Sequence, residues 1–523
     1  MHSHRLIAPD RIDVHSFEQP FSCFEFVDRD FAGTPSIHRI FSLARSHEAK
    51  TLTIEQISPA GLIADENAEI LAYHPDFRPG KLFRLAFWKP EFSRAEEAGS
   101  CRDTDLVSYA ILKEDFSPSG KVKGWHVFEA VVRKYDHRHN CVPHQPTYTV
   151  GVNGREFAIP GILYCQQNTL NKVCAHVALR SVLCRHLPDG DIAYRRINEL
   201  ARNLDPPAFN LKHGLTVMQI RAVLDGFGIA YRDIDYAESS RTSPDIRKTH
   251  LYQKFVYSGV ESGAGALLGF RLTGPGITGS PKHIIPFHGH TFNKDTWVPD
   301  ADISYFNVGA GVGYIPSESW TSSFLGHDDN FGANFCVPRL YIQPDQAEYV
   351  VELLNNGYAY SGVQAEAMAL PVIYSMYPHL QQSGNPWVGR LAEYAHPHVQ
   401  KVVLRAVAVT KARYLDHLEN ESDWEGKTEH KDLLAPLRQL LPDNLWCVEL
   451  SIPQLFPANE RKLGEVVLDG SRSIGSPKGI DFSLFCLARL PGMYLLIKTA
   501  GKNGQVFYSV PSQIESHVPV IES

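Results

Sequence analysis

The sequence predicts an α+β fold divided among three domains, on three observations. Residues 1–150 alternate short apolar runs with Pro, Gly and Asp, which is typical of a mostly β domain. Residues 151–340 contain two helical patterns followed by a cluster of strand patterns, as in a domain with separate helical and sheet layers. Residues 341–523 mix the two patterns in a third, α+β domain. With 523 residues, the chain is long enough for three or four domains of about 150 residues each.

The composition excludes several classes of protein. Hydrophobic residues make up 43% of the chain and charged residues 21%, as in folded globular proteins. The net charge of −7 provides no overall basic surface for nucleic acid. No apolar run approaches the roughly 18 residues of a membrane span, and the N-terminus lacks the basic and apolar blocks of a signal peptide. We therefore expect a soluble, cytoplasmic protein that binds neither nucleic acid nor membranes.

The cysteine pattern agrees with a reducing compartment. The nine cysteines are scattered, odd in number and contain no C-x-x-C pair, which argues against a disulfide framework and against a zinc ribbon. We expect most of them to be reduced and buried. One of them remains a candidate nucleophile.

In the N-terminal domain, strands are expected at 50–57, 106–112 and 125–135, where apolar and polar residues alternate. Asn153 and Gly154 stand between two further alternating runs. Asn-Gly supplies the positive φ angles of a type I′ turn, so a hairpin is expected there, leading into the second domain.

In the second domain, a buried helix is expected to begin near Cys174, because apolar residues follow at helical spacing. A second helix is expected within 213–231, with Thr216 as its N-cap and Gly226 as its stop. Strand patterns then follow in four short segments: LYQKFVY at 251–257, ALLGFRL at 266–272, HIIPF at 283–287 and TWV at 296–298.

The third domain carries no motif with a recognisable chemistry. Its helices are expected at 345–356, 363–376 and 429–441, and its strands at 399–410, 445–452 and 482–488. A charged segment at 419–432 is expected to be a solvated loop, and Asn503-Gly504 marks another turn.

The second domain contains each group that a thiol hydrolase needs. Such an enzyme requires a thiolate, a base, a group that orients the base, and donors for the oxyanion. Cys174 opens a helix, where the dipole stabilises a thiolate and the backbone N–H groups are free. Gln167, with Gln166 beside it, precedes the cysteine by seven positions and offers a side-chain amide. His283 begins a strand, and Asp300 follows the next one.

This arrangement resembles the papain-like cysteine peptidase superfamily, in particular its bacteriocin-processing branch that cleaves double-glycine leader peptides. In that branch, a glutamine precedes the helix-capping cysteine, and a Gly-Leu-Thr/Ser helix follows, as in GLTVMQI here. A histidine then opens a strand of the form H-x5-G, matched by His283 and Gly289, and an Asp or Asn follows. The resemblance implies a papain-like core, with a helical layer on an antiparallel sheet. It implies Cys174 as nucleophile, His283 as general base, Asp300 as the group that orients it, and Gln167 as oxyanion donor.

The chain departs from that branch in ways that leave its substrate open. Ala175 stands where those peptidases have glycine after the cysteine, and their glutamine precedes the cysteine by six positions. Their usual membrane spans and ATPase P-loop are both lacking, so a leader-peptide substrate does not carry over.

Other interpretations of these residues stay open. Cysteine is among the most buried residue types, so Cys174 alone is an ordinary core thiol. His283 alone is a satisfied core histidine, and His288 and His290 compete with it as the base. We predict a cysteine peptidase that cleaves a peptide or isopeptide bond of a protein or peptide substrate, without a cofactor or metal. The alternatives are an acyl or amide transferase and an inactive scaffold on the same fold. The large flanking domains suggest a dedicated protein partner.

Three weaker motifs each have a simpler interpretation. The segment HRHNCVPH, with His137, His139, Cys141 and His144, could bind zinc or another soft metal, but an interdomain loop is expected. HDDNFG at 327–332 offers oxygen ligands without the spacing of a calcium loop. An Asx turn is expected there, close enough to the proposed site to contact substrate. GAGVG at 309–313 is expected to be a loop. Serine hydrolase and zincin motifs do not occur.

Overall fold

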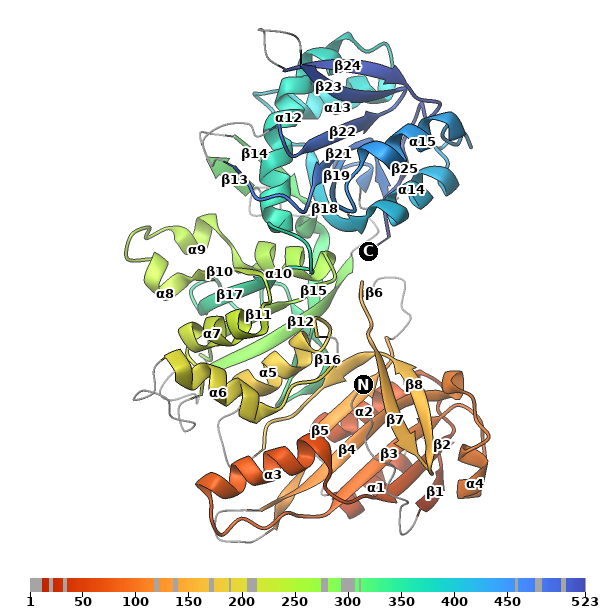
Figure 1. Cartoon of the computed structure of the whole chain (residues 1–523), viewed down its shortest axis with the longest axis vertical. Coiled ribbons are helices and arrows are strands. Elements are labelled where there is room, and N and C mark those ends of the chain that lie inside the picture. Colours follow the sequence, from red (N-terminus) through yellow and green to blue (C-terminus); the bar gives the residue numbers. More distant parts are fainter. Residues whose placement is uncertain are drawn as a thin grey trace.

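The computed structural model describes most of the chain, namely residues 12–17, 22–31, 35–116, 122–134, 140–168, 174–187, 190–204, 214–273, 281–292, 306–309, 312–456, 460–475, 482–499 and 505–522. Within these residues the strands gather into three large sheets, which follow one another along the long axis of the molecule (Figure 1). Helices pack on each sheet, so the predicted mixture of helices and several antiparallel sheets in more than one domain is confirmed. None of the described helices has both the length and the apolar character needed to cross a bilayer.

The N-terminal sheet is antiparallel throughout. Its strands, in spatial order, are β1 (Ile12–Ser16), β2 (Thr51–Gln56), β3 (Leu82–Trp88), β4 (Leu106–Phe116), β5 (Val122–Val132) and β9 (Ile162–Tyr164). Alternate residues along β3 face opposite ways. Leu85 and Phe87 pack with helices α1 (Ser22–Phe31) and α2 (Pro35–Ser46), whereas Leu82 and Trp88 pack on the other face. That second face is covered by α3 (Gly61–Tyr73), by the hairpin of β7 (Thr147–Val152) and β8 (Arg155–Pro160), and by α5 (Cys174–Leu183).

The middle sheet carries the predicted histidine strand. Its spatial order is β10 (Tyr231–Asp235), β17 (Ala347–Leu353), β11 (Ala266–Arg271), β12 (Lys282–Phe292), β15 (Thr321–Asp328) and β16 (Gly332–Pro338), and the short β6 (Asn140–Cys141) also pairs with β12. Helices α5, α6 (Tyr194–Leu204) and α7 (Val217–Phe227) share a core with one face of this sheet, and α10 (Tyr252–Glu261) packs on the other. Two short helices, α8 (Tyr236–Ser239) and α9 (Ile246–Thr249), lie beside β10 (Figure 1).

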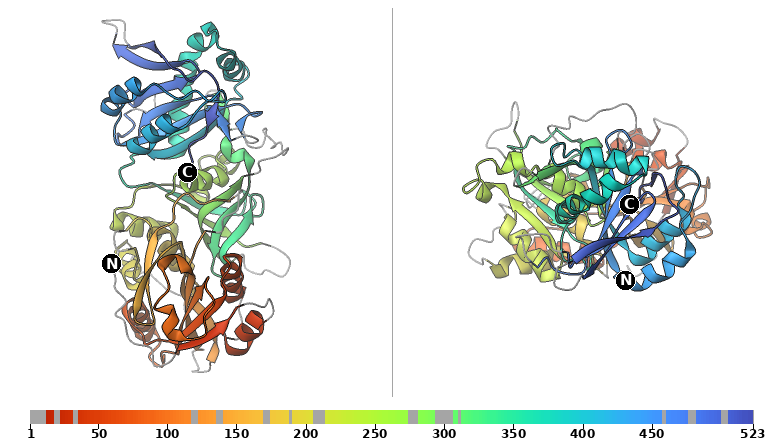
Figure 2. Two further views of the ribbon diagram at one scale, coloured as in Figure 1. Left: turned by 90° about the vertical axis from the view of Figure 1, so that its right-hand side faces the viewer. Right: turned by 90° about the horizontal axis from the view of Figure 1, so that it is seen from above.

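The C-terminal sheet joins strands from both sides of residue 340. Its order is β13 (Phe306–Gly309), β14 (Val312–Pro316), β18 (Val403–Thr410), β19 (Asn444–Ser451), β21 (Gly464–Asp469), β22 (Phe485–Leu490), β23 (Met493–Thr499) and β24 (Gln505–Pro511), and only the β14–β18 pair among these is parallel. Helices α12 (Gly362–Gln382) and α13 (Pro386–Ala395) pack on one face, and α14 (Lys411–Asn420) and α15 (Lys431–Leu440) on the other. The chain end returns to the junction with the middle sheet (Figures 1 and 2).

Hydrogen bonding crosses both predicted domain boundaries. β9 follows residue 150 but forms an edge of the N-terminal sheet, by pairing with β5. β17 follows residue 340 but lies inside the middle sheet, between β10 and β11. Both contacts are made over long sequence separations, which local patterns do not report.

Two predicted elements are wrong, and both corrections have the same physical reason. Residues 251–257 were expected to form a strand, but Leu251 is the N-cap of α10 and the others lie in that helix, whose residues are all buried. A short run of buried residues does not distinguish a helix from a strand, and the helical spacing of Tyr252, Phe255, Val256 and Val260 appears only over the full length of α10. Residues 345–356 were expected to form a helix, but they contain β17, a central strand with buried residues on both faces.

Several local signals are confirmed. Asn153 and Gly154, with φ angles of 48° and 74°, join β7 to β8. The Thr216 hydroxyl accepts the backbone N–H of Gln219 and caps α7. The helix continues past Gly226, however, and ends at Gly228, which adopts the left-handed conformation at φ 68°.

Candidate active site

Cys174 is the first residue of α5 and the only residue of this helix that is not fully buried. The helix is held between the N-terminal and middle sheets, because its apolar residues pack against β9 on one side and β12 on the other. At a helix N-terminus, the first backbone N–H groups have no partner within the helix, and the dipole favours negative charge. The packing therefore places a half-buried thiol where a thiolate is stabilised.

His283 lies beside this thiol on β12. The strand is hydrogen-bonded on both sides, and Phe270 of β11 lies opposite His283, with its ring edge-on to the imidazole at 5.6 Å. His283 is 7% exposed, and the side chain of Cys174 lies close enough to raise the pKa of its imidazole. The predicted thiol and the predicted base thus meet in the folded chain.

Two adjacent carboxylates lie on the other side of the imidazole. The Nε2 of His283 is 3.1 Å from Oδ2 of Asp328 and 3.4 Å from Oδ1 of Asp329. Asp328 ends β15, which pairs with β12, so the register of these two strands brings the carboxylates to the histidine. The other oxygen of Asp328 accepts the backbone N–H groups of Asn330 and Phe331, at 2.8 and 3.1 Å. This is the Asx turn expected at 327–332.

The charges of these groups support one another. Burial lowers the pKa of His283, but its contacts with Asp328, Cys174 and Asp329 outweigh this effect and raise the pKa to about 10. Burial would raise the pKa of Asp328, yet His283 and the two backbone N–H groups hold it below its ordinary value. Burial raises the pKa of Asp329 to about 6. Near neutral pH, His283 is an imidazolium between the sulfur of Cys174 and an ionised Asp328.

The N-terminal sheet and its helices support the carboxylate turn from outside. The Tyr164 hydroxyl, on β9, lies 3.3 Å from the backbone oxygen of Asp328 and 2.9 Å from the Ser36 hydroxyl of α2. The Arg39 guanidinium, also on α2, donates to the backbone oxygens of Ala333 and Asn334 just beyond the turn. The site thus depends on contacts between two sheets.

A cavity of only about 10 Å³ lies against the thiol, lined by Cys165, Cys174, Val177, Ala178, Ser181, Ile284, Pro286, His327 and Asp329. It has room for about one water molecule. No substrate side chain fits into this space, so a substrate has to approach the exposed side of Cys174.

The two remaining predicted site residues are not brought to the histidine by the described structure. Asp300 lies outside the described residues, and its role stays a prediction. Gln167 follows β9 and is half-buried, and its side chain makes no hydrogen bond to any described residue. The neighbouring Gln166 is tied to β5, because its Oε1 accepts the backbone N–H of Val127 at 3.0 Å. Gln167 is therefore the glutamine whose amide is available, and its role as oxyanion donor also stays a prediction.

The competing histidines have other partners. His288 is buried and bonds through Nε2 to the Asn334 side chain at 2.9 Å. His290 forms a separate cluster, in which its Nε2 donates to Glu261 at 2.5 Å and its side chain also lies close to that of Cys141. Of the three histidines, His283 is the one whose pKa is raised by Cys174.

Among the residues that the structure describes, two groups of side chains have the composition of a metal site. His283, Asp328 and Asp329 form one, and Cys141, Glu261 and His290 form the other, with ligand atoms within 4.8 Å of one another in each. In both, the histidine Nε2 already lies at hydrogen-bond distance from a carboxylate, so a cation would have to replace that proton. Of the ligand-rich segment 137–144, His137 and His139 lie outside the described residues.

The sequence predicted that Cys174 and His283 lie together, but it did not predict Asp328 and Asp329 as partners of His283. A signal for them was present, because the two adjacent aspartates stand directly before Asn330 and Gly332, which are typical turn residues. An antiparallel strand that ends beside a histidine strand delivers its last residues to that histidine. The pairing of β12 with β15 was not readable from either segment alone.

Comparison with known proteins adds no relative. No family model matches the sequence, and no curated protein sequence matches it either.

Proposed function

We propose that this protein is a thiol hydrolase, and specifically a cysteine peptidase, in which Cys174 is the nucleophile and His283 the base. The observation that supports this is the alignment of Cys174, at a helix N-terminus, with His283 and Asp328: the thiol lies close enough to raise the pKa of His283, whose Nε2 is 3.1 Å from Asp328. The proposal assigns to Asp328 the orienting role that the resemblance implies for Asp300.

The fold around these residues is consistent with a papain-like core. In such a core, a helix that begins with the cysteine packs on an antiparallel sheet that carries the histidine, and here α5 packs on β12. The order cysteine, histidine, aspartate along the chain is also that of the resemblance. The likeness extends to the arrangement of helix and sheet only, and the substrate does not follow from it.

The proposed reaction follows from the charges of the site. The proton of Cys174 passes to His283, and the resulting thiolate attacks the carbonyl carbon of a peptide or isopeptide bond. The developing oxyanion accepts hydrogen bonds from backbone N–H groups at the start of α5 and from the side-chain amide of Gln167. The His283 imidazolium gives its proton to the leaving amine, so a thioester and a free amine form. His283, now neutral, takes a proton from water, whose oxygen attacks the thioester and releases the acid. Asp328 keeps the imidazole ring oriented in both steps.

Active-site labelling tests this proposal. The full chain is treated with one equivalent of a peptide-like chloromethyl ketone near neutral pH, and intact mass and peptide mapping locate the adduct. We expect one adduct at Cys174, its loss in Cys174→Ala, and labelling at least tenfold slower in His283→Ala. Cys141→Ala is the matched control, because Cys141 also contacts a histidine, and it should label as the wild type does.

Two other outcomes distinguish the alternatives. Fast labelling of Cys174, combined with turnover that yields an amine-containing product in place of the acid, would indicate a transferase, in which an amine replaces water. Product mass separates the two products. Slow, uniform labelling of several cysteines would contradict the proposal and favour an inactive scaffold.

A further inference from the structure

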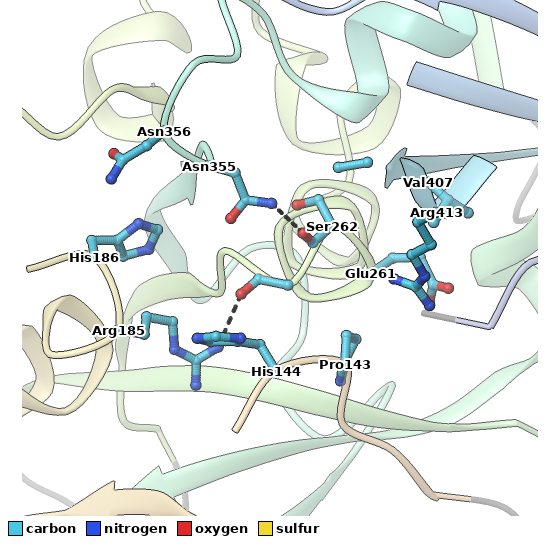
Figure 3. A pocket seen from close by; sticks show the side chains of 12 residues that line it. Pro143, His144, Arg185, His186, Glu261, Ser262, Asn355, Asn356, Val407 and Arg413 are labelled. Atoms are coloured by element: carbon cyan, nitrogen blue, oxygen red, sulfur yellow. Dashed lines mark hydrogen bonds between the residues drawn. The ribbon is translucent and has the colours of Figure 1, made fainter. Parts of the chain in front are cut away.

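A second, larger pocket lies at the junction of the middle and C-terminal sheets. Its volume is about 260 Å³, close to the lower end of the range for small-ligand sites. Figure 3 shows its lining, which comes from segments far apart in the sequence: Pro143, His144, Arg185, His186, Glu261, Ser262, Gly263, Asn355, Asn356, Val407, Ala408 and Arg413. Arg185 and His186 follow α5, whose other end carries Cys174. The pocket is thus separated from the thiol by the length of that helix.

Arg185 is the unusual residue of this pocket. Its guanidinium forms no ion pair with a described carboxylate, and its Nε is buried without a hydrogen-bond partner among the described residues. Its one hydrogen bond to a described residue runs from Nη1 to the backbone oxygen of Gly263, at 3.4 Å. A guanidinium has five N–H donors, so most of its hydrogen-bonding capacity faces the pocket unused. Burial accordingly lowers the pKa of Arg185.

The acidic residue in the lining does not compensate this charge. The Glu261 carboxylate is already bonded to Arg405, with an Nε–Oε1 distance of 2.8 Å, and to His290 through its other oxygen. Arg405 also pairs with Glu449 at 2.7 Å, so these groups form a closed network behind the pocket wall. The charge of Glu261 is satisfied inside that network.

The remaining polar lining adds further donors, some of them already engaged. Arg413 adds a second guanidinium from the first turn of α14, and its Nη2 donates to the backbone oxygen of Glu522. Asn355 and Asn356 add side-chain amides, and that of Asn355 donates to the backbone oxygen of Ser262. Burial and the charge of Arg185 lower the pKa of His144, so this imidazole is neutral near pH 7. In Figure 3, the side chains of Arg185 and His144 lie next to each other at one wall, and Arg413 lies across the pocket.

We propose that this pocket binds a small oxyanion, either inorganic phosphate or the phosphate or carboxylate group of a small metabolite, with Arg185 as its principal ligand. The Arg185 side chain is half-buried with its Nε fully buried, and charged groups that are withdrawn from water are normally paired. An oxyanion with two oxygens matches the parallel N–H groups of a guanidinium. The bound anion would connect the end of α5 to α14, and so the middle sheet to the C-terminal one. The site is independent of the proposed thiol chemistry.

Binding of inorganic phosphate to the full chain tests this proposal. Isothermal titration calorimetry and thermal unfolding are measured with sodium phosphate, with sodium succinate and with sodium chloride at equal ionic strength. We expect phosphate or succinate to bind and to raise the melting temperature beyond the effect of chloride. Binding by phosphate alone or by succinate alone identifies the oxyanion group. Absence of binding by both overturns the proposal.

Three variants assign the site. Arg185→Met keeps the length of the side chain and removes its charge, and we expect the affinity to fall about tenfold or more. Arg413→Met, at the opposite wall, should weaken binding as well, and Arg438→Met, an exposed arginine on α15, is the control that should not. Without anion, Arg185→Met should be at least as heat-stable as the wild type, because it removes an unpaired charge. Unchanged affinity in Arg185→Met overturns the proposal, and if that variant does not fold, the comparison of Arg413→Met with Arg438→Met decides.

Discussion

Replacing Asp328 by asparagine should weaken the charged state of His283 without dismantling the turn around it. Asn keeps the shape of Asp and an oxygen that can accept the N–H groups of Asn330 and Phe331, which Asp328 Oδ1 now accepts at 2.8 and 3.1 Å. It removes the negative charge that lies 3.1 Å from Nε2 of His283. The variant thus isolates the electrostatic contribution of one carboxylate.

The pKa of His283 sets the magnitude. Its value of about 10, against an ordinary 6.5, corresponds to about 5 kcal/mol in favour of the imidazolium. Asp328, Cys174 and Asp329 share this preference, and Asp328 makes the shorter of the two carboxylate contacts. We assign it about 2 kcal/mol, so the pKa of His283 should fall by about 1 to 2 pH units in Asp328→Asn.

The sign of the pH dependence follows. Because folding raises the pKa of His283, its contribution to stability is complete below pH 6.5 and is lost as the pH rises through about 10. Because folding lowers the pKa of Asp328, its contribution is present above pH 3.8 and is lost as the pH falls below that value. The difference in unfolding free energy between the wild type and Asp328→Asn should therefore be largest, at about 2 kcal/mol, between about pH 5 and pH 8.

Two measurements check this prediction. NMR titration of ¹³C-labelled histidine follows the His283 ring, which is assigned by its absence in His283→Gln, and urea unfolding from pH 5 to pH 10 gives the free energies. Asp329→Asn is the matched control, because its carboxylate is the more distant one. If Asp329→Asn lowers the pKa of His283 more than Asp328→Asn does, Asp328 is not the principal partner and the reasoning fails.

Three further predictions concern stability. Burial raises the pKa of Asp329 to about 6, so ionisation of this carboxyl destabilises the fold as the pH rises. In urea unfolding, Asp329→Asn should therefore stabilise the protein by about 1 to 3 kcal/mol at pH 8 and by less at pH 5. An equal effect at both pH values would contradict this. Contacts with Cys141 and Glu261 outweigh burial and raise the pKa of His290 to about 9. His290→Gln should therefore lower the unfolding free energy by about 2 to 3 kcal/mol at pH 7 and by less above pH 9. A loss that grows with pH would refute the ion pair. A Cβ at Gly289 would lie 2.8 Å from the backbone oxygen of Cys141. Gly289→Ala should therefore lower the urea midpoint by the equivalent of about 1 to 3 kcal/mol. Gly384 has open space around it, so Gly384→Ala is the control that should leave the midpoint unchanged.

Where the candidate site is concerned, the sequence predicted the thiol and the histidine that lie together in the structure. Cys174 was recognisable because a helical pattern begins at it, and His283 because it opens an apolar strand. Both are local features, since a helix start or a strand is encoded by residues within a few positions. The Asn153-Gly154 hairpin and the Thr216 cap were readable for the same reason.

Only the tertiary structure decided which acids serve the base. Asp328 is 45 residues from His283, and it reaches the imidazole because β15 pairs with β12 in one register. Strand pairing also decides that His283 lies beside Cys174 and His290 beside Cys141, since β6, which carries Cys141, joins β12 at His290. Such pairings are chosen by packing over the whole sheet, and a strand's own residues do not name its neighbour.

The same limit explains the misread elements and the second pocket. The segment 251–257 covers too little of α10 to show its helical spacing, and the neighbours that bury this helix come from distant parts of the chain. The unpaired charge of Arg185 likewise arises from what surrounds it, because its position in the sequence resembles that of many surface arginines at helix ends. Local chemistry fixed where helices, turns and reactive groups lie along this chain, and long-range packing fixed which of these groups meet.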